Sequence, residues 1–507
     1  MPDIDPSFLS YPARELAGAA LQRAAELGAE HADFRLERIR VGILQLRDGT
    51  LTTSSDSEDV GLCVRVVHQG AWGFASGITR TAAAARTLAE QAVATAKISR
   101  QLSSEPVVLA PEPVYPDVTW VSAYEQNPFD VPEGERVGRL SELSARLMSS
   151  DGVDHVDASL MQVLENKFYA DSAGTMTTQQ RVRLHPEFTA VNVDRAAGQF
   201  SSMRTLAPPA GRGWEYLTGT GWDFDAEIAE LPDVLREHVK APSVEAGHYD
   251  LVIDPSNLWL TIHESIGHAT ELDRALGYEA AYAGTSFATL DKLGTLRYGS
   301  PVMNVTGDRT VEHGLGTVGY DDEGVATQQF DIIKDGVLVG YQLNRQMAHD
   351  NADRLAGAES RSNGCGYADS PGHIPLQRMA NVSISPAPDG PSTQELISRV
   401  ERGIYIKGDR SWSIDMQRFN FQFTGQQFHR IENGRLVGQL RDVAYQATTT
   451  DFWGSMEAVG GPQTYVLGGA FNCGKGQPGQ VASVSHGCPA ALFRDVNVLN
   501  TKTEGGR

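Results

Sequence analysis

The chain has 507 residues, 41% of them hydrophobic, and its 64 Asp and Glu outnumber 43 Lys and Arg to give a formal net charge of −21. This length predicts two or more domains, each with a sizeable core. So acidic a chain offers no basic stripe to neutralise phosphates, and we expect neither a nucleic-acid nor an anionic-membrane partner. The sequence holds no apolar run of about eighteen residues and no apolar signal-peptide core, so we expect a cytoplasmic protein.

Helical and strand patterns alternate in the amino-terminal half. Apolar spacing and Ala content predict elements in the order 11–28 (helix), 31–46 and 60–76 (strands), 80–98 (helix) and about 131–148 (helix), with further strands after them. The triplets DGT and HQG are turn signals, and a proline-rich stretch over residues 104–128 predicts a linker. The fold class we predict is α+β, with an amino-terminal α/β-type domain over residues 1–225 built on a small antiparallel sheet.

The remaining residues, 226–507, are predicted to form a mainly β carboxy-terminal domain with one helix. Asp254 and Pro255 supply an N-cap and a first-turn proline, and apolar positions then keep helical spacing as far as Leu276, just before Gly277. Short strands punctuated by glycine follow from about residue 300. The triplets KDG and ENG among them are hairpin signals, which favours a meandering antiparallel sheet or a barrel-like layer.

The predicted helix carries HESIGHATELDRA, residues 263–275, in which two histidines stand five positions apart. Zinc peptidase helices usually read H-E-x-x-H, with the histidines four positions apart. On a regular α-helix a spacing of five turns the two imidazoles about 140° away from each other. A one-residue π-bulge brings them back towards one face, and Gly267, just before the second histidine, makes that deformation least costly. We therefore predict a metal-binding helix with a π-turn or kink between His263 and His268.

Two histidines leave zinc one short of the three protein ligands that a catalytic site usually has. The candidates for the third ligand are Glu271, Asp273, a later histidine, Cys473 and Cys488. Cys473 lies in FNCGKGQPG, which is typical of a glycine-flanked loop where a thiolate can approach a metal closely. Cys488 in HGCP is the competitor, although a packing role is equally expected for it. For Cys63 and Cys365 we expect the usual role of free cysteine, a small buried hydrophobe.

Four short motifs appear in an order that resembles the TldD/PmbA family of metallopeptidases. They are the HE-x-x-G-H helix, the DDEG turn, IENG and CGK, which begin at His263, Asp321, Ile431 and Cys473. Together they span about residues 250–500, and the amino-terminal half resembles the family more loosely. The late run departs from the family, because it reads CGKGQPGQ where CGK-x-GQ is usual. Since HE-x-x-x-H is present, the chain resembles the catalytic, TldD-like branch rather than the partner branch that lacks this motif.

The resemblance implies a zinc site and an activity. It maps the zinc ligands to His263, His268 and Cys473, and the general base to Glu264. It further implies zinc-dependent hydrolysis of peptide bonds in unfolded segments or short peptides, by a homodimer or by a heterodimer with a motif-lacking paralogue. Two alternatives stay open: a non-catalytic peptide-binding subunit of a peptidase complex, and a metal-dependent amidase that acts on a small molecule.

Overall fold

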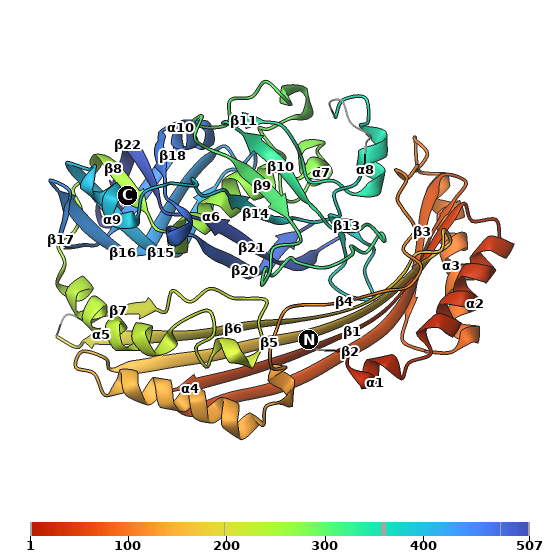
Figure 1. Ribbon diagram of the computed structural model, residues 1–507, viewed down its shortest axis with the longest axis horizontal. Helices are drawn as coiled ribbons and strands as arrows, with labels where there is room; N and C mark the ends of the chain where they lie inside the picture. Colours follow the sequence, from red (N-terminus) through yellow and green to blue (C-terminus); the bar gives the residue numbers. More distant parts are fainter. Residues whose placement is uncertain (1–2, 197, 356–360, 477, 505–507) are drawn as a thin grey trace.

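The computed structural model describes residues 3–196, 198–355, 361–476 and 478–504, and its α+β fold has two halves, one above the other in Figure 1. The amino-terminal half is built on seven strands: β1 (His31–Arg47), β2 (Thr50–His68), β3 (Ala71–Gly77), β4 (Val118–Val121), β5 (His155–Asp171), β6 (Met176–Asp194) and β7 (Gln199–Arg204). Their order is β3-β2-β1-β5-β6-β4, with β7 paired to β6, and only β4 and β6 run parallel. The predicted strands are present, but the sheet is not small, because β1, β2, β5 and β6 each run for 17 or 19 residues.

The alternation of side chains along β1 decides what each face of this sheet packs against. Phe34, Leu36, Leu44 and Leu46 point to one face, where they are buried under helices. The helices are α2 (Ala13–Glu26) and α3 (Ala82–Arg100) at one end of the sheet and α4 (Glu133–Met148) and α5 (Phe224–Lys240) at the other (Figure 1). All but α5 match helices that the sequence predicts. Arg35 points to the opposite face, where it meets the carboxy-terminal half.

The carboxy-terminal half contains a ring of five strands closed by hydrogen bonds. The strands are β8 (Gly247–Ile253), β22 (Ala491–Asn500), β18 (Val443–Thr448), β16 (Asn420–Glu432) and β15 (Arg402–Ile414). They pair in this order, and β15 closes the ring by pairing in parallel with β8. Two further strands extend it, β17 (Arg435–Leu440) on β16 and β19 (Met456–Val459) on β22. The barrel-like layer that the sequence predicts is therefore present.

The remaining elements of this half are short. A four-stranded sheet is formed by β11 (Val337–Leu338), β10 (Gln329–Lys334), β9 (Val305–Asp308) and β14 (Asn381–Ile384), and hairpins by β12 (Gly366–Tyr367) with β13 (Leu376–Gln377) and by β20 (Val466–Lys475) with β21 (Gln480–Cys488). Short helices elsewhere are α1 (Pro6–Leu9), α8 (Arg345–Asp350), α9 (Thr393–Ser398), α10 (Thr449–Gly454) and α11 (Thr501–Glu504). Within the described residues, no helix combines the length and apolar character needed to cross a bilayer.

The two-residue turn signals of the sequence adopt hairpin geometry. The pairs are Asp48 and Gly49, Gln69 and Gly70, Asp335 and Gly336, and Asn433 and Gly434. Every one of these residues has a positive φ, between 48° and 77°. Positive φ at both central residues is the type I′ turn, whose twist matches that of the flanking strands. The turn chemistry at these positions thus fixes four strand pairings locally.

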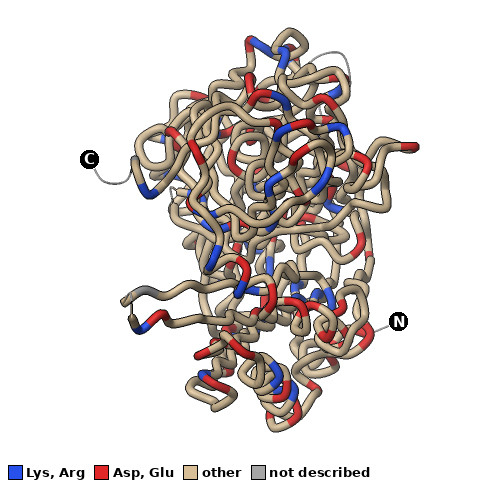
Figure 2. Tube along the Cα trace, turned by 90° about the vertical axis from the view of Figure 1, so that its left-hand side faces the viewer, with Lys and Arg blue, Asp and Glu red and all other residues tan. Residues whose placement is uncertain are grey.

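The two halves meet in a buried layer of charged side chains, which we call the seam. Its members are Asp33, Arg35, Glu37, Arg65, Glu165, Lys167, Arg181 and Arg183 from the amino-terminal sheet and Asp321, Asp322 and Glu323 from the DDEG turn. Asp322 pairs with Lys167 at 2.8 Å, and Glu323 pairs with Arg65 at 3.0 Å. Along the whole trace, acidic and basic residues are interspersed over both halves (Figure 2). The DDEG turn thus docks one half on the other.

The domain division predicted at residues 225 and 226 falls inside α5. This helix packs with α4 and β7 in one hydrophobic cluster. Phe224 and Ile228 of α5 lie in that cluster on either side of the predicted boundary. The division stays a prediction.

Candidate metal centre

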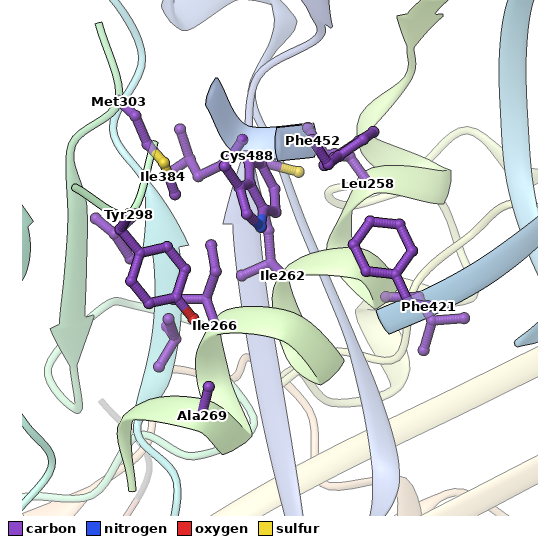
Figure 3. Close-up of a cluster of buried hydrophobic side chains, with 14 of the residues drawn as sticks. Leu258, Ile262, Ile266, Ala269, Tyr298, Met303, Ile384, Phe421, Phe452 and Cys488 are labelled. Atoms are coloured by element: carbon purple, nitrogen blue, oxygen red, sulfur yellow. The ribbon is translucent and has the colours of Figure 1, made fainter. Parts of the chain in front are cut away.

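The helix α6 (Pro255–Ile262) is capped and buried as the sequence predicts. The Asp254 carboxylate accepts a hydrogen bond from the N–H of Ser256, and Pro255 occupies the first turn. Apolar side chains at helical spacing, Leu258, Ile262, Ile266 and Ala269, enter the main core. Figure 3 shows them beside Tyr298, Met303, Ile384, Phe421, Phe452 and Cys488. With this face held in the core, the polar residues of the motif occupy a different face.

The helix changes pitch at the motif. From His263 to Gly267 the backbone forms a π-helical turn (η3), closed by a hydrogen bond from the N–H of His268 to the carbonyl of His263. A 3₁₀ turn (η4) follows over His268–Thr270, and the extended backbone of Glu271 ends the helix before α7 (Leu272–Ala275). The π-turn predicted from the spacing is confirmed. The prediction that the helix, with its π-turn, extends to about Leu276 is wrong, because Glu271 leaves the helical conformation.

Gly267 serves the turn through its lack of a side chain. Its φ of −52° and ψ of −60° are helical and open to any residue. A Cβ atom at this position would lie 2.6 Å from the Sδ of Met379 and 3.5 Å from the Cε1 of His486. The reason for glycine is therefore close packing against Met379, which precedes β14, and against β21. The conformational freedom expected from the sequence is not what the position uses.

Cys473 reaches the histidines from β20. The register of the β20–β21 hairpin shifts between Ala470 and Cys473, so that a β-bulge lies directly before the cysteine and re-aims its side chain. The Sγ of Cys473 lies 3.8 Å from the Nε2 of His268. Ligand atoms of His263, His268 and Cys473 all lie within 4.8 Å of one another. Cys473 thus belongs to a bulged strand and not to the glycine-flanked loop that its sequence suggests.

Hydrogen bonds fix the tautomers of both histidines. The Nδ1 of His268 lies 2.8 Å from an oxygen of the Glu271 carboxylate, an acceptor. The Nδ1 of His486 lies 2.8 Å from the carbonyl oxygen of Val382, so this nitrogen donates and the Nε2 of neutral His486 accepts. That Nε2 lies 2.7 Å from the Nδ1 of His263. Both motif histidines therefore carry a proton on Nδ1, and their Nε2 lone pairs are free for a cation.

Glu271 and Asp273, the acidic candidates for the third ligand, take other partners. Glu271 lies on the Nδ1 side of His268, away from the Nε2 that faces Cys473. Its second oxygen lies 3.3 Å from the Nζ of Lys475, and Asp273 pairs with the same ammonium group at 2.7 Å. Lys475 of the CGK run thereby ties the strand of the cysteine to the segment after the π-turn. Burial raises the pKa of Asp273 to about 6, although Lys475 opposes that shift.

Cys488 takes the packing role that was one of the two expectations for HGCP. The Sγ of Cys488 lies 3.8 Å from the carbonyl oxygen of Pro255 within the hydrophobic cluster (Figure 3). Burial raises the pKa of this thiol well above its ordinary value. His486 does not support Cys488 but contacts His263 instead. The sequence carries no spacing signal for that contact.

The thiol of Cys473 behaves differently. Burial opposes its ionisation, yet the adjacent imidazoles of His263 and His268 hold its pKa well below the ordinary value. Burial lowers the pKa of His268 far below that of a free imidazole. The pKa of His263 is raised despite burial, because Cys473 lies beside it. The cluster therefore favours the thiolate, which is the form of cysteine that binds metals.

Glu264 is buried next to His263 and has one strong partner. One of its carboxylate oxygens accepts a hydrogen bond from the Nη1 of Arg418, in the turn between β15 and β16. Arg418 also acts electrostatically on His268 and Cys473, which places its charge close to the cluster. Sequence reasoning missed Arg418, since nothing in its local sequence marks it.

The three donors fit a zinc ion. Two imidazole nitrogens and one thiolate are a ligand set of the kind found in catalytic zinc sites, which keep a fourth position open. Zinc binds nitrogen and sulfur at about 2.0–2.3 Å, so donors that lie within 4.8 Å of one another need to close in only slightly. The Nδ1 hydrogen bonds to Glu271 and His486 are the outer contacts that orient metal-binding histidines.

Comparisons with known proteins agree with this chemistry. Residues 246–500 match the family model described as the PmbA/TldA metallopeptidase C-terminal domain, and residues 32–96 match PmbA/TldA metallopeptidase domain 1. A metalloprotease of Methanocaldococcus jannaschii is 27% identical over 439 residues, which cover 87% of this chain and 91% of that protein. A protein of Saccharolobus solfataricus named zinc metalloprotease TldD homolog is 22% identical over 485 residues, which cover 94% and 98%.

The fold has solved relatives as well. The structure of TldE from Thermococcus kodakarensis aligns with a TM-score of 0.68 at 16% identity and covers 95% of this chain and 99% of that one. At so low an identity the likeness concerns the fold alone. The family model for the carboxy-terminal domain spans half of the chain and includes the complete His263, His268 and Cys473 cluster. The chain belongs to the TldD/PmbA family of metallopeptidases.

Proposed function

We propose that this chain is a zinc-dependent peptidase of the catalytic, TldD-like branch of its family. The observation that carries the proposal is the convergence of His263, His268 and Cys473, with both Nδ1 atoms bonded outwards and Glu264 adjacent. A bound metal cation would explain why the ligand atoms of these three buried side chains converge on one point. The name of the Saccharolobus solfataricus relative supports zinc as the metal.

The roles of the residues follow from their positions. Zinc, when bound, would supply a Lewis acid that lowers the pKa of a water molecule and polarises the scissile carbonyl. Glu264, next to a ligand and held by Arg418, accepts the proton of the attacking water and later gives it to the leaving amine. Glu271 and His486 keep the two imidazoles in the tautomer that binds a cation.

Extended peptides are the proposed substrates. Among the described residues, β20 pairs with β21 alone, and its other edge is the place that we propose for an added strand, although the Cys473 carbonyl already accepts a hydrogen bond from Arg378. A cavity of about 250 Å³ lies along this strand, lined by Gly468, Phe471 and Asn472 and by Trp259 of α6. Because main-chain hydrogen bonds read little of the side chains, such binding suits unfolded segments or short peptides. Trp259, which lines this cavity, also contacts His263 and His486, at 6.5 and 6.3 Å between ring centroids, so a peptide bound there would lie near the metal centre.

We further propose that the protein works in the cytoplasm as a homodimer or as a heterodimer with a motif-lacking paralogue. The acidic composition and the resemblance to the family support these two statements. Size measurement of the purified chain, alone and mixed with such a paralogue, tests the assembly.

Metal analysis combined with a substrate panel tests the proposed function. We expect about one zinc per chain, and cleavage of unstructured peptides that stops with a chelator and returns with zinc. The panel includes small amides of single amino acids. Zinc-dependent cleavage of the amides alone would identify an amidase, and stoichiometric zinc with no cleavage of either class would leave a binding subunit.

Glu264→Gln separates catalysis from metal binding. The amide cannot accept the proton, so we expect peptide cleavage to fall by about two orders of magnitude or more, the scale of losing a general base. Zinc content should stay stoichiometric, because Glu264 is not among the three clustered ligands. A Glu264→Gln protein that cleaves at the normal rate removes Glu264 from the mechanism.

A further inference from the structure

Arg418 occupies a strained position in the turn between β15 and β16. Its φ of 65° lies in the left-handed region, which residues other than glycine rarely adopt. Two hydrogen bonds hold the backbone of Arg418 in this conformation. The N–H of Arg418 donates to the carbonyl of Asp415 at 3.0 Å, and the Thr449 hydroxyl donates to the carbonyl of Arg418 at 2.7 Å. A backbone held in a conformation that costs about 1 kcal/mol or more is a reason to look for a function of the side chain.

The Asp415 carboxylate makes this turn rigid. It accepts hydrogen bonds from the N–H groups of Gln417, Phe419 and Asn420, at 2.9 to 3.0 Å. These bonds lower the pKa of Asp415, although its partial burial opposes the shift. The turn therefore aims the side chain of Arg418 at one place, the metal centre.

Some N–H donors of the Arg418 guanidinium group have no acceptor at the described metal centre. Its side chain is 14% exposed, and Glu264 is its one acceptor among the described residues. The Nε–H is buried and has no hydrogen-bond partner in that part of the chain. A guanidinium group carries five N–H donors in a fixed fork, so the pair with Glu264 uses only a fraction of them.

Arg418 brings a positive charge to the metal centre. The groups that act on it electrostatically are Glu264, Glu271 and Cys473, of opposite sign, and Arg274, of the same sign. With a divalent ion bound beside Arg418, an anionic oxygen that forms at the centre would be attracted by both cations.

The chemistry of hydrolysis supplies that oxygen at the right moment. When water attacks the scissile carbonyl carbon, its proton passes to Glu264 while a new C–O bond forms. The electron pair of the carbonyl π bond moves onto the carbonyl oxygen, which becomes negative. Glu264 loses its charge in the same step, so Arg418 loses one anionic partner as the other appears.

We propose that Arg418 is a catalytic residue that donates hydrogen bonds to the scissile carbonyl oxygen as this oxygen becomes negative, exchanging its contact with Glu264 for one with substrate. The inference rests on the proposed peptidase function and deepens it. Stabilising an oxyanion with a donor fixed beforehand is worth about two to three orders of magnitude in kcat. The strained turn provides such a fixed donor.

Kinetics and inhibitor binding test the proposal on the full-length, zinc-loaded protein. We expect Arg418→Ala to lower kcat about 100-fold or more, with KM and zinc content nearly unchanged. Affinity for a phosphinic peptide, which mimics the anionic oxygen, should fall about 100-fold, whereas affinity for the neutral reduced-amide analogue should not change. Arg418→Lys should recover part of both losses. Arg430→Ala, which removes an exposed arginine of β16, is the matched control and should behave as the unaltered protein.

Arg418 could instead act only by positioning Glu264. Repeating the inhibitor measurement in a Glu264→Gln background distinguishes this role from direct contact with the substrate. Direct contact predicts that Arg418→Ala still weakens phosphinic-peptide binding there. If that affinity is the same with and without Arg418, the residue only positions Glu264 and the proposal is wrong. Should Arg418→Ala fail to fold, Arg418→Gln replaces it in every measurement.

Arg418 could also bind the terminal carboxylate of a peptide. Cleavage of one peptide with a free and with an amidated carboxy terminus tests this alternative. We expect equal kcat/KM for both forms. A preference for the free acid that Arg418→Ala abolishes would mean that Arg418 binds a terminal carboxylate, and would overturn the proposal. Failure of the peptidase function looks different, because the unaltered protein would then cleave no peptide at all.

Discussion

Two buried polar clusters in this molecule differ in composition and in how their charges are satisfied. In the seam, every cationic side chain has a carboxylate within reach: Arg65 lies between Asp33 and Glu323, and Lys167 contacts Asp322. In the metal centre, ligand atoms of His263, His268 and Cys473 lie within 4.8 Å of one another, and the nearby cation, Arg418, pairs with Glu264. The seam pairs its cations with carboxylates of the protein, whereas we propose that a metal ion pairs with the thiolate of the metal centre.

This difference distinguishes buried polar groups that stabilise the fold from those that bind a ligand or take part in a reaction. A buried ion pair that is fully matched contributes little net stability but is costly to break, because one charge is then left alone in a medium of low dielectric. A cluster of ligand atoms without a partner is tolerated only where another species supplies the missing charge. The DDEG turn and the HESIGH turn, both family motifs, fall on opposite sides of this division.

Removing the thiolate breaks the metal centre, and we expect the largest effect from it. Cys473→Ala should leave a two-histidine site that binds zinc several orders of magnitude more weakly and lacks activity, since each ligand shares in a binding free energy of about 10 to 16 kcal/mol for closed structural sites. Competition with a chromophoric chelator measures the affinity. Cys488→Ala is the control and should change stability alone. Stoichiometric zinc in dialysed Cys473→Ala protein would refute the assignment of this ligand.

Removing one cation breaks the seam. Arg65→Met leaves two buried carboxylates without their partner, and we expect a loss of about 3–5 kcal/mol in the free energy of unfolding. Arg47→Met is the matched control on β1, because Arg47 pairs with Asp157 in an exposed ion pair worth at most about 1 kcal/mol. Urea unfolding measures both. Zinc affinity should be the same in both variants, and a lower affinity in Arg65→Met would show that the two clusters are coupled.

The smallest effect that we expect comes from removing the hydrogen bond between His486 and His263. His486→Leu removes the acceptor for the Nδ1 of His263, and we expect zinc affinity to fall about 10- to 100-fold, the usual scale for losing an orienting contact. His486→Gln can still accept that hydrogen bond and should retain more of the affinity. Chelator competition on both variants makes the test. Equal affinities for Leu and Gln would show that position 486 acts through packing and not through the tautomer of His263.

Local sequence determined much of the fold and part of the site. The five-residue spacing of His263 and His268 predicted the π-turn, because rotation per residue is a property of the helix and needs no tertiary contact. Glycine-containing dipeptides predicted four hairpins for the same reason. The class of the fold, the long helices other than α5 and the buried face of α6 also follow from periodicity. The full length of β2 did not, since its exposed polar first half continues the strand without an apolar pattern.

Tertiary structure alone decided how the centre is completed. Cys473, His486 and Arg418 lie 205, 223 and 154 residues from the partners that they contact in the motif. No spacing rule spans such distances, because these contacts depend on how β20, β21 and the β15–β16 turn pack around α6. The sequence thus determined which residues could bind a metal, and the packing of distant strands determined which of them meet, which orient the histidines, and where the arginine lies.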